Sequence, residues 1–413
     1  MNLIVQKFGG SSVADIERIR HVARRVADSK DKYRDGVVVV VSAMGKTTDR
    51  LVGMARELSS TPSAREMDML LATGEQISIA LLSMALHELG YKAISLTGAQ
   101  AGIITENLHT KAKILKINAD AIRKLLAEDY IVVVAGFQGT TPDQQITTLG
   151  RGGSDTTAVA LAGALDAPVC EIYTDVDGVY TTDPNVVPQA QKLYEISYEE
   201  MLELAQLGAK VLHPRSVECA KNCRTAIHVR SSFNTSEGTY VKAMKDLEIH
   251  RPVTGVTSDM HQAKLAIREV PDKPGIAAHL FGALAQANIS VDMIIQSVND
   301  DMTNDIAFTT HEDDLNSAIG ITQQVARDLG SGDVLYDAEV AKVSIVGVGM
   351  IGTPGIAASM FEVLASAGIN IQMISTSEIK ISCVVARSEA QRAMQVIHER
   401  FVISEIQDEQ AIA

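Results

Sequence analysis

The chain has 413 residues, too many for one hydrophobic core, so two or three domains are expected. It carries 37 Lys and Arg against 51 Asp and Glu, a net charge of −14 that argues against non-specific nucleic-acid binding, and it has no Trp for base stacking. The start, MNLIVQKF, lacks a basic signal-peptide segment, and no apolar stretch approaches the roughly 18 residues of a membrane span. We therefore expect a cytoplasmic protein with no nucleic-acid or membrane partner.

Up to about residue 240, short apolar runs alternate with helical patterns. The runs are bounded by turns, which is typical of strands buried on both faces; they are Leu3–Phe8, Val37–Ser42, Ile131–Ala135, Val169–Thr174 and Ile227–Val229. Helical spacing of apolar residues predicts helices over 16–26 and 69–89, and a Ser197/Glu200 capping box begins another that stops at Gly208. This alternation predicts an α/β fold, a mostly parallel sheet sandwiched by helices, with ligands beyond the carboxyl ends of the strands.

An internal repeat follows a polar segment without clear periodicity, which we interpret as a linker. Asp272–Ser297 aligns without gaps on Gly352–Ser377, with 13 identities in 26 positions, and an Ala-Lys-led strand precedes each copy. Two copies of one small α+β module are therefore predicted. The predicted boundaries are 1–245 for the large domain, 246–262 for the linker, and 263–338 and 339–413 for the modules, with the C-terminal strand as a candidate to complete the first.

Loops of small and polar residues follow the predicted strands of the large domain, and together they predict a cleft at one edge of the sheet. They are Gly9–Ser12, Ser42–Asp49, Gly136–Thr141 and Thr174–Pro184. Lys7 lies in a strand that is otherwise apolar. A structural pair with a carboxylate is one interpretation, but a lysine next to Gly-Gly is better explained by a phosphate contact.

The stretch LGRGGSDTTAVALAGAL, Leu149–Leu165, predicts a glycine-rich turn that runs into an apolar helix capped by Ser154 or Asp155. Backbone N–H groups at such a turn, with the positive end of the helix dipole, bind an anion, most often phosphate. Arg151 can add a bidentate contact. A tight turn with a good cap is the plainer alternative.

Two further patterns are weaker. Gly347, Gly349 and Gly352 spell GxGxxG, but the equivalent positions of the first repeat lack these glycines and no suitably placed acid follows, so we interpret them as a loop between strand and helix. Cys219 and Cys223 stand four residues apart near His213. Structural zinc takes four ligands, so buried reduced thiols are favoured over a zinc site, and no metal site is predicted.

Seven motifs, in this order, resemble the aspartokinases: KFGGSS from Lys7, SAMGKTTD from Ser42, REMDMLLATGE ending at Glu75, AGFQG from Ala135, TTLGRGGSDTTA from Thr147, YTDVDGVYTTDP from Tyr173 and GAKVLHPRS from Gly208. The repeat is similar to the paired ACT domains that follow the kinase domain in that family. The resemblance covers almost the whole chain. It implies an amino acid kinase fold followed by two ferredoxin-like ACT domains, and the length suits the monofunctional form.

The resemblance also implies roles for individual residues. Lys7 and Asp155 would be the catalytic pair. The substrate L-aspartate would be surrounded by Gly10, Ser42, Thr47, Glu75, Phe137, Gly139, Arg151, Gly152, Gly153 and Ser154. ATP, with Mg²⁺ bridging its phosphates, would be held by Lys7, Gly9, Gly10, Ser11, Thr174, Asp175, Tyr180, Asp183, Pro184 and Lys210. Effectors would contact Asp272, Gly275, Ala277, Asp292 and Gln296 in the first ACT domain and Ile356, Ala357, Asn370, Ile371, Ser377 and Glu378 in the second.

The implied reaction agrees with the chemistry of these residues. The side-chain carboxylate of aspartate, with a reference pKa of about 3.9, is already ionised, so phosphorylation to 4-phospho-L-aspartate requires no general base. Bringing two anions together requires positive charge and positioning, which Lys7, Arg151 and Lys210 can supply. Arg151 suits the α-carboxylate of the substrate. Glu75 suits its α-ammonium group, with a solvated acid at a helix end as the alternative.

Regulation and assembly are further expectations from the resemblance. Lysine and threonine together are the expected inhibitors, with lysine alone as the runner-up, and ACT domains that only dimerise the enzyme are the alternative. A homo-oligomer, dimer or tetramer, is expected through these domains, and a shorter ACT-only chain could start at Met244. Two other functions stay open: a non-catalytic amino-acid sensor, which would be free to lose Lys7 or Asp155, and a related glutamate or acetylglutamate kinase.

Overall fold

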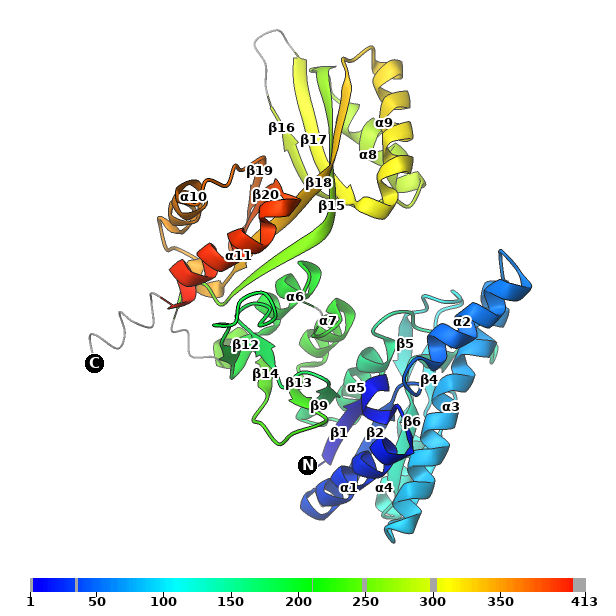
Figure 1. The fold of residues 1–413 in the computed structure, drawn as a ribbon. Helices are drawn as coiled ribbons and strands as arrows, with labels where there is room; N and C mark the ends of the chain where they lie inside the picture. Colours follow the sequence, from blue (N-terminus) through cyan, green and yellow to red (C-terminus); the bar gives the residue numbers. More distant parts are fainter. Residues whose placement is uncertain (1–2, 34–35, 210, 247–250, 298–302, 404–413) are drawn as a thin grey trace, which may run out of the picture. The chain divides into compact units, whose positions relative to one another are not determined.

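The computed structural model describes residues 3–33, 36–209, 211–246, 251–297 and 303–403 (Figure 1). The chain divides into two compact units. The first comprises Met1–Tyr180, Lys192–Gln206 and Lys210–Glu248, and the second comprises Thr181–Gln191, Leu207–Ala209 and Ile249–Ala413. The predicted domain boundaries remain predictions, but residues 181–191 lie in the second unit because Val187 is buried in its core.

Over the described residues, the first unit is organised around an eight-stranded sheet with the order β12-β14-β13-β9-β1-β2-β6-β3. All neighbours are parallel except the pair β13 and β14, so the sheet is mostly parallel, as predicted. The strands are β1 (Leu3–Phe8), β2 (Gly36–Val41), β3 (Ala93–Leu96), β6 (Ile131–Ala135), β9 (Val169–Thr174), β12 (Glu195–Ser197), β13 (Ala226–Ser231) and β14 (Thr239–Lys242).

Helices cover both faces of this sheet. Alternate residues of the central strands, such as Ile4, Val37 and Val39, pack against α1 (Ile16–Lys32) and α3 (Ala64–Glu88). The residues between them, Lys7 among these, face the other side, because side chains alternate along a strand. On that side lie α4 (Asp120–Ala127), α5 (Gly153–Ala164) and α7 (Pro214–Cys223), and the unit also contains α2 (Thr47–Leu58) and α6 (Tyr198–Gln206).

Helix α3 is long enough and apolar enough to cross a membrane. The expectation from the sequence that no apolar stretch approaches the length of a membrane span was therefore wrong. Half of its most apolar window is buried inside the protein, and two of its carboxylates, Asp68 and Glu75, are also buried. This is the pattern of a core helix, whose apolar content serves packing on the sheet.

A smaller four-stranded sheet, which the sequence did not predict, also lies in the described part of the first unit. Its order is β5-β4-β7-β8, formed by β4 (Ile103–Thr105), β5 (Ile114–Ile117), β7 (Gln138–Thr140) and β8 (Ile146–Thr148). Two-residue strands β10 (Val179–Tyr180) and β11 (Lys192–Leu193) pair with each other. The loops between the strands of the small sheet form part of the functional site described below.

The second unit contains the two predicted repeats, joined through one sheet. Among described residues its order is β16-β17-β15-β18-β20-β19, antiparallel throughout, with α8 (Ile276–Gln286), α9 (Leu315–Leu329), α10 (Ile356–Ser366) and α11 (Ala390–His398) packed on it. The strands are β15 (Gly255–Pro271), β16 (Val291–Gln296), β17 (Thr303–His311), β18 (Val334–Val346), β19 (Met373–Thr376) and β20 (Lys380–Ala386).

The long strand β15 begins inside the segment that was expected to be a linker. Residues 255–259 pair with 342–346 of the second repeat, and residues 262–267 pair with the first half of β18. The segment lacks clear periodicity because the register shifts twice between Asp259 and Lys264. The C-terminal strand suggested for the first repeat falls partly on residues 404–413, which lie outside the described residues.

Candidate functional site

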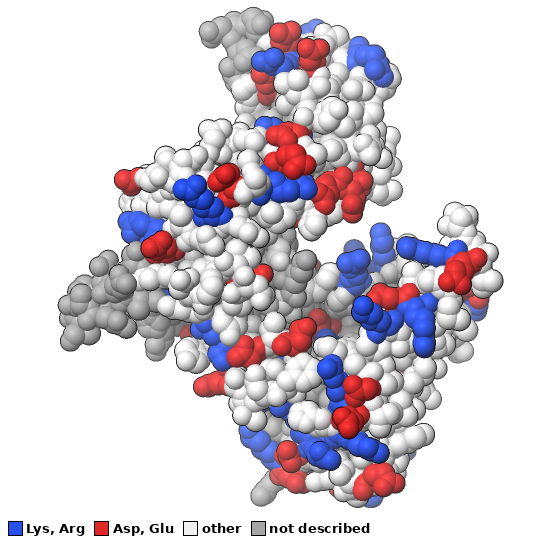
Figure 2. Space-filling model, viewed as in Figure 1, with Lys and Arg blue, Asp and Glu red and all other residues white. Residues whose placement is uncertain are grey.

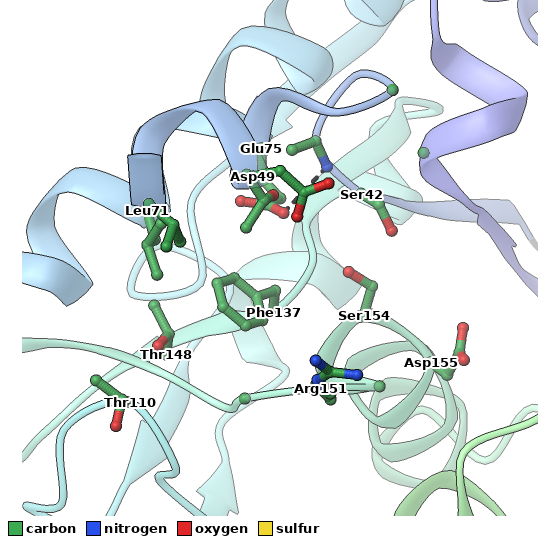
Figure 3. A pocket seen from close by; sticks show the side chains of 18 of the residues that line it. Ser42, Asp49, Leu71, Glu75, Thr110, Phe137, Thr148, Arg151, Ser154 and Asp155 are labelled. Atoms are coloured by element: carbon green, nitrogen blue, oxygen red, sulfur yellow. Dashed lines mark hydrogen bonds between the residues drawn. The ribbon is translucent and has the colours of Figure 1, made fainter. Parts of the chain in front are cut away.

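A pocket of about 970 Å³ lies beyond the carboxyl ends of β1, β2 and β6, closed by α2, α3 and the beginning of α5. This is the edge at which α/β sheets bind ligands. Figure 3 shows Glu75, Asp49 and Ser42 on one side of the pocket and Arg151 and Asp155 on the other. Side chains of both signs therefore face one space.

The ion pair of Lys7 and Asp155 forms part of the pocket wall. Lys7 is the penultimate residue of β1 and Asp155 lies in the first turn of α5, and Lys7 Nζ is 2.5 Å from Asp155 Oδ1. Gly9 lies so close that a Cβ there would be 3.4 Å from Lys7 Nζ. From the sequence, Lys7 could form a structural ion pair or contact a phosphate. In the structure Lys7 forms the ion pair, and it also lines the pocket, where its ammonium group can contact a ligand.

The glycine-rich loop enters α5 through two left-handed residues, Gly150 (φ +76°) and Gly152 (φ +68°). The expected cap was Ser154 or Asp155, but the N-cap is Gly152, and within the described part of the chain no side chain caps the helix. A Cβ at Gly152 would lie 2.2 Å from His213 Cγ, so a side chain is excluded by space as well as by φ. Because no described side chain accepts a hydrogen bond from the N–H groups of the first turn, these groups can face an anion.

Glu75 is a buried acid, not the solvated helix-end acid that was the alternative. Its side chain is on α3, the residue is 3% exposed, and its Oε1 accepts a hydrogen bond from Ala43 N at 3.0 Å. Burial raises the pKa of Glu75 to about 7, and the Ala43 N–H only partly offsets this. Oε2 has no hydrogen-bond partner among the described residues, so the carboxyl group can accept a donor from a ligand.

Phe137 closes the middle of the pocket in a strained conformation. Its φ of +67° lies in the left-handed region, which is unusual for a bulky side chain. Its N–H donates to Thr157 Oγ1 at 3.2 Å, a bond from the second turn of α5. Backbone strain of this kind is concentrated at functional sites.

The structure brings most of the predicted substrate and catalytic residues into this one pocket: Lys7, Gly10, Ser42, Glu75, Phe137, Arg151, Gly152, Gly153, Ser154 and Asp155. Thr47 and Gly139 are not among its lining residues. Thr47 begins α2 and its neighbour Thr48 lines the pocket instead. Gly139 lies in β7, where a Cβ would meet the Thr105 methyl group at 2.7 Å, so it permits close packing of the small sheet.

Sequence reasoning missed other lining residues, namely Ala43, Gly45, Thr48, Asp49, Val52, Gly53, Arg56, Leu71, Thr110, Thr148 and Gly150. Thr48, Val52 and Arg56 recur every four residues along α2, so helical spacing could have shown that one face of α2 borders the site. Thr110 lies in a loop that matches no motif, and no local pattern marks it.

The expected nucleotide residues lie outside the lining of this pocket, apart from Lys7 and Gly10. In the first unit, Thr174 Oγ1 donates to Asp175 Oδ1 at 3.0 Å and Tyr180 Oη donates to Asp177 Oδ1 at 2.8 Å. Gly9 is the N-cap of the Gly10–Val13 turn after β1, and Ser11 lies within that turn. Asp183 and Pro184 belong to the second unit, and Lys210 lies outside the described residues.

The expected effector residues lie along the same part of each repeat, from the turn before the first helix to the strand that follows it, but only Ala277 and Ala357 occupy equivalent positions. Gly275 (φ +98°) and Gly355 (φ +96°) are the N-caps of α8 and α10. Asp292 on β16 pairs with the buried Lys342 of the other repeat, and the equivalent Gln372 accepts a hydrogen bond from Lys264. The remaining residues of this set lie before or at the beginnings of α8 and α10, at the end of β16, and just before or just after β19; they are Asp272, Ala277, Gln296, Ile356, Ala357, Asn370, Ile371, Ser377 and Glu378.

The cysteines and metal-ligand residues add no site. Cys170 and Cys383 are buried, Cys219 is half-buried, and Cys223 is exposed, so the expectation of buried thiols is wrong for Cys223 at the end of α7. Within the described ranges, no group of three or more His, Cys, Asp and Glu side chains could hold a metal ion.

Comparison with known proteins agrees with this architecture. The amino acid kinase family matches residues 2–231, and ACT domains match residues 265–327 and 343–401. An aspartokinase from Geobacillus stearothermophilus is 54% identical over 405 residues, 98% of each chain. Two crystal structures of aspartokinase III from E. coli, one with aspartate and ADP and one with lysine and aspartate, are both 28% identical, with TM-scores of 0.78 and 0.76. They cover 96% and 97% of this chain, which spans 99% and 100% of theirs.

The family match covers more than half of the chain, and the identity to the Geobacillus enzyme extends over nearly the whole of both sequences. The fold agrees as well, since a helix-sandwiched, mostly parallel sheet precedes two joined ACT domains. The chain therefore belongs to the aspartokinases, and it is an aspartate kinase built from an amino acid kinase domain and two C-terminal ACT domains.

Proposed function

We propose that the pocket around Lys7 and Asp155 is where the γ-phosphoryl group of ATP passes to the side-chain carboxylate of L-aspartate, which releases ADP and forms 4-phospho-L-aspartate. The observation that carries this proposal is the Lys7–Asp155 pair, 2.5 Å apart, at the uncapped beginning of α5. Lys7 offers positive charge to the transferring group, and Asp155 holds that ammonium in place. The E. coli relative crystallised with aspartate and ADP supports the choice of ligands.

Charge complementarity supports an orientation for aspartate. Arg151 and Glu75 face each other across the pocket, so the guanidinium can bind the α-carboxylate and the buried carboxyl can accept the α-ammonium (Figure 3). The side-chain carboxylate is then directed toward Lys7. No general base is needed, because this carboxylate is ionised at neutral pH.

ATP would be bound by the loops after β1 and β9, with Thr174, Asp175 and Tyr180 as contacts, together with Asp183, Pro184 and Lys210. Magnesium would neutralise phosphate charge during the transfer. Because magnesium is usually bound by one or two carboxylates plus substrate phosphates, the absence of a protein cage over the described residues is compatible with it. Asp49 and Asp155 are the pocket carboxylates that could approach it.

The ACT domains would bind lysine and threonine together, lysine alone being the alternative, and shift the enzyme to a less active state. The E. coli relative crystallised with lysine supports an amino-acid effector. The same proposal includes assembly into a dimer or tetramer through the ACT domains, a shorter ACT-only chain and a cytoplasmic location. It also includes a role for 4-phospho-L-aspartate as the precursor of lysine, threonine and methionine.

Trapping the acyl phosphate with hydroxylamine tests these points in one assay, with ATP, magnesium and aspartate, and with lysine and threonine added separately and together. We expect hydroxamate from aspartate, and a loss of turnover only when both amino acids are present. Inhibition by lysine alone would overturn the concerted effect and leave the kinase reaction standing. Hydroxamate from glutamate or acetylglutamate instead of aspartate would overturn the substrate.

A further inference from the structure

Asp68 is a buried carboxylate that no part of the reaction described above uses. It lies on α3, is 0% exposed, and accepts hydrogen bonds from three neighbours. Thr148 Oγ1 donates to it at 2.5 Å, His109 Nδ1 lies at 2.7 Å, and the backbone N–H of Thr110 is 3.1 Å from both of its oxygens. A buried carboxylate with this many hydrogen bonds is fixed in position, and the same bonds fix the positions of His109, Thr110 and Thr148.

Two of those partners, Thr110 and Thr148, line the substrate pocket. They lie near each other and near Leu71, on the side of the pocket away from Asp155 (Figure 3). Thr110 has a φ of +69°, in the left-handed region that a β-branched residue rarely adopts. Such a backbone conformation persists only where hydrogen bonds or packing from the surrounding structure stabilise it. The N–H of Thr110 donates to the carboxylate of Asp68, so Asp68 stabilises this conformation.

Arg215 on α7 holds the same two loops at a second place. Its guanidinium donates to Ala112 O at 3.1 Å and also to Leu149 O, while Ala112 N donates to Thr148 O at 3.0 Å. The loop around Thr110 is thereby fixed to the loop that carries Arg151. Their contact is close, since a Cβ on Gly150 would lie 3.1 Å from Thr110 O.

We propose that Asp68 is a positioning residue for the aspartate subsite: it holds Thr110 in its left-handed conformation and so sets the pocket wall against the Arg151 loop. This inference rests on the proposed function, in which the pocket binds aspartate. Asp68 is not among the residues that line the pocket, and its partners Thr110 and Thr148 lie on the side away from Asp155. Its loss therefore weakens aspartate binding more than phosphoryl transfer or ATP binding.

Steady-state kinetics on Asp68→Ala and Asp68→Asn test this. Asp68→Ala removes every acceptor, and we expect KM for aspartate to rise about tenfold or more, with KM for ATP and kcat within about twofold of wild type. Asp68→Asn keeps one acceptor oxygen for Thr110 and Thr148, so its rise should be smaller, and it serves as the measurement if the alanine variant does not fold. An equal rise in both KM values, or no rise for aspartate in Asp68→Asn and Asp68→Ala alike, would overturn the proposal.

Rescue distinguishes positioning from general stability. Glycine adopts the left-handed conformation without strain, so in a Thr110→Gly background the wall no longer depends on Asp68. We expect Asp68→Asn to raise KM for aspartate by a smaller factor in that background than in wild type. The same factor in both backgrounds would mean that Asp68 does not act through Thr110, and would overturn the inference.

Two controls complete the design. Glu200 on α6 is also a buried carboxylate, 2% exposed, that accepts hydrogen bonds from Ser197, but it does not line the pocket. Glu200→Gln should lower the thermal stability without changing KM for aspartate; a matching rise in that KM would refute a specific role for Asp68.

Arg151→Lys, the second control, should raise KM for aspartate. If it does so while Asp68→Ala does not, this inference fails alone; if Arg151→Lys also has no effect, the aspartate site is misplaced and both proposals fail.

Discussion

Lowering the pH from 8 to 6 should raise KM for aspartate about tenfold, because Glu75 takes up a proton. Burial raises the pKa of Glu75 to about 7, and only its ionised form can pair with the α-ammonium group of aspartate. With this pKa, KM is multiplied by 1 + 10^(7−pH), which is about elevenfold at pH 6, twofold at pH 7 and 1.1-fold at pH 8. The substrate's own α-amino and side-chain groups do not titrate in this range.

The assay is ADP release at saturating ATP and magnesium, with aspartate varied at each pH between 6 and 8. KM for ATP is measured alongside, because ATP phosphates also titrate near pH 6. Asp49→Asn is the matched control, since Asp49 is an exposed carboxylate of the same pocket, and it should keep the wild-type slope. Glu75→Gln should raise KM at pH 8 and lose the slope. A wild-type KM that is flat from pH 6 to 8 would refute the pairing of Glu75 with the ammonium group.

The same pKa has an opposite consequence for stability. The folded-state pKa of about 7 exceeds the unfolded value of 4.5, so the folded state binds more protons between these pH values. The contribution of Glu75 to the free energy of unfolding therefore falls as pH rises from about 4.5 to about 7, by about 3 kcal/mol at about 1.4 kcal/mol per pKa unit, and does not change further above that range. Glu75→Gln should recover part of this at pH 8 in urea unfolding, so a variant that binds aspartate worse should be more stable.

Three further predictions address the other parts of the chain. Lys7→Ala should lower kcat by about a hundredfold or more in a folded protein of somewhat lower thermal stability, since Asp155 loses its counter-ion, and near-normal turnover would contradict the assignment of Lys7. Gly152→Ala should destabilise by about 1–3 kcal/mol in urea unfolding, because its Cβ would meet the His213 ring at φ +68°; an unchanged midpoint would contradict this. Gln296→Ala should relieve inhibition by lysine plus threonine at unchanged kcat, and Asp292→Ala should do so with some loss of stability, since its buried lysine partner loses its counter-ion. Superimposable inhibition curves would refute the effector site.

Burial on both faces explains which parts of the fold the sequence predicted. The central strands β1, β2, β6 and β9 were predicted within a residue because most positions in such a strand are apolar, and apolar runs are visible without context. Strands β5 and β8 were missed. They have four and three residues, and β5 has no buried residue, so neither alternation nor composition separates them from loops.

The site was predicted where its chemistry is local in sequence and missed where it is not. The glycine-rich turn, Arg151 and Asp155 stand within one motif, and Lys7 is conspicuous as a charge in an apolar strand. Asp68 offers no such indication: it resembles an ordinary polar position on a helix, and its partner Thr110 is 42 residues away. The left-handed conformation of Thr110 is equally invisible, because a β-branched residue is among the last that sequence rules would place there.

The buried carboxyl group and the two strained residues of the pocket each cost stability in the free enzyme and favour substrate binding. An empty pocket with Glu75 ionised would hold an uncompensated buried charge, so near neutral pH the site reduces this cost by keeping the acid partly protonated. The ammonium group of aspartate brings the missing counter-charge, and the charge pair then exists only in the complex. Phe137 and Thr110, both at positive φ, cost stability in the free enzyme too, but their bonds to Thr157 and Asp68 keep the walls in place before the substrate arrives. Because the pocket walls are already ordered in the free enzyme, aspartate binding does not have to supply the free energy for ordering them. More of the binding free energy then remains to bring the two anions together.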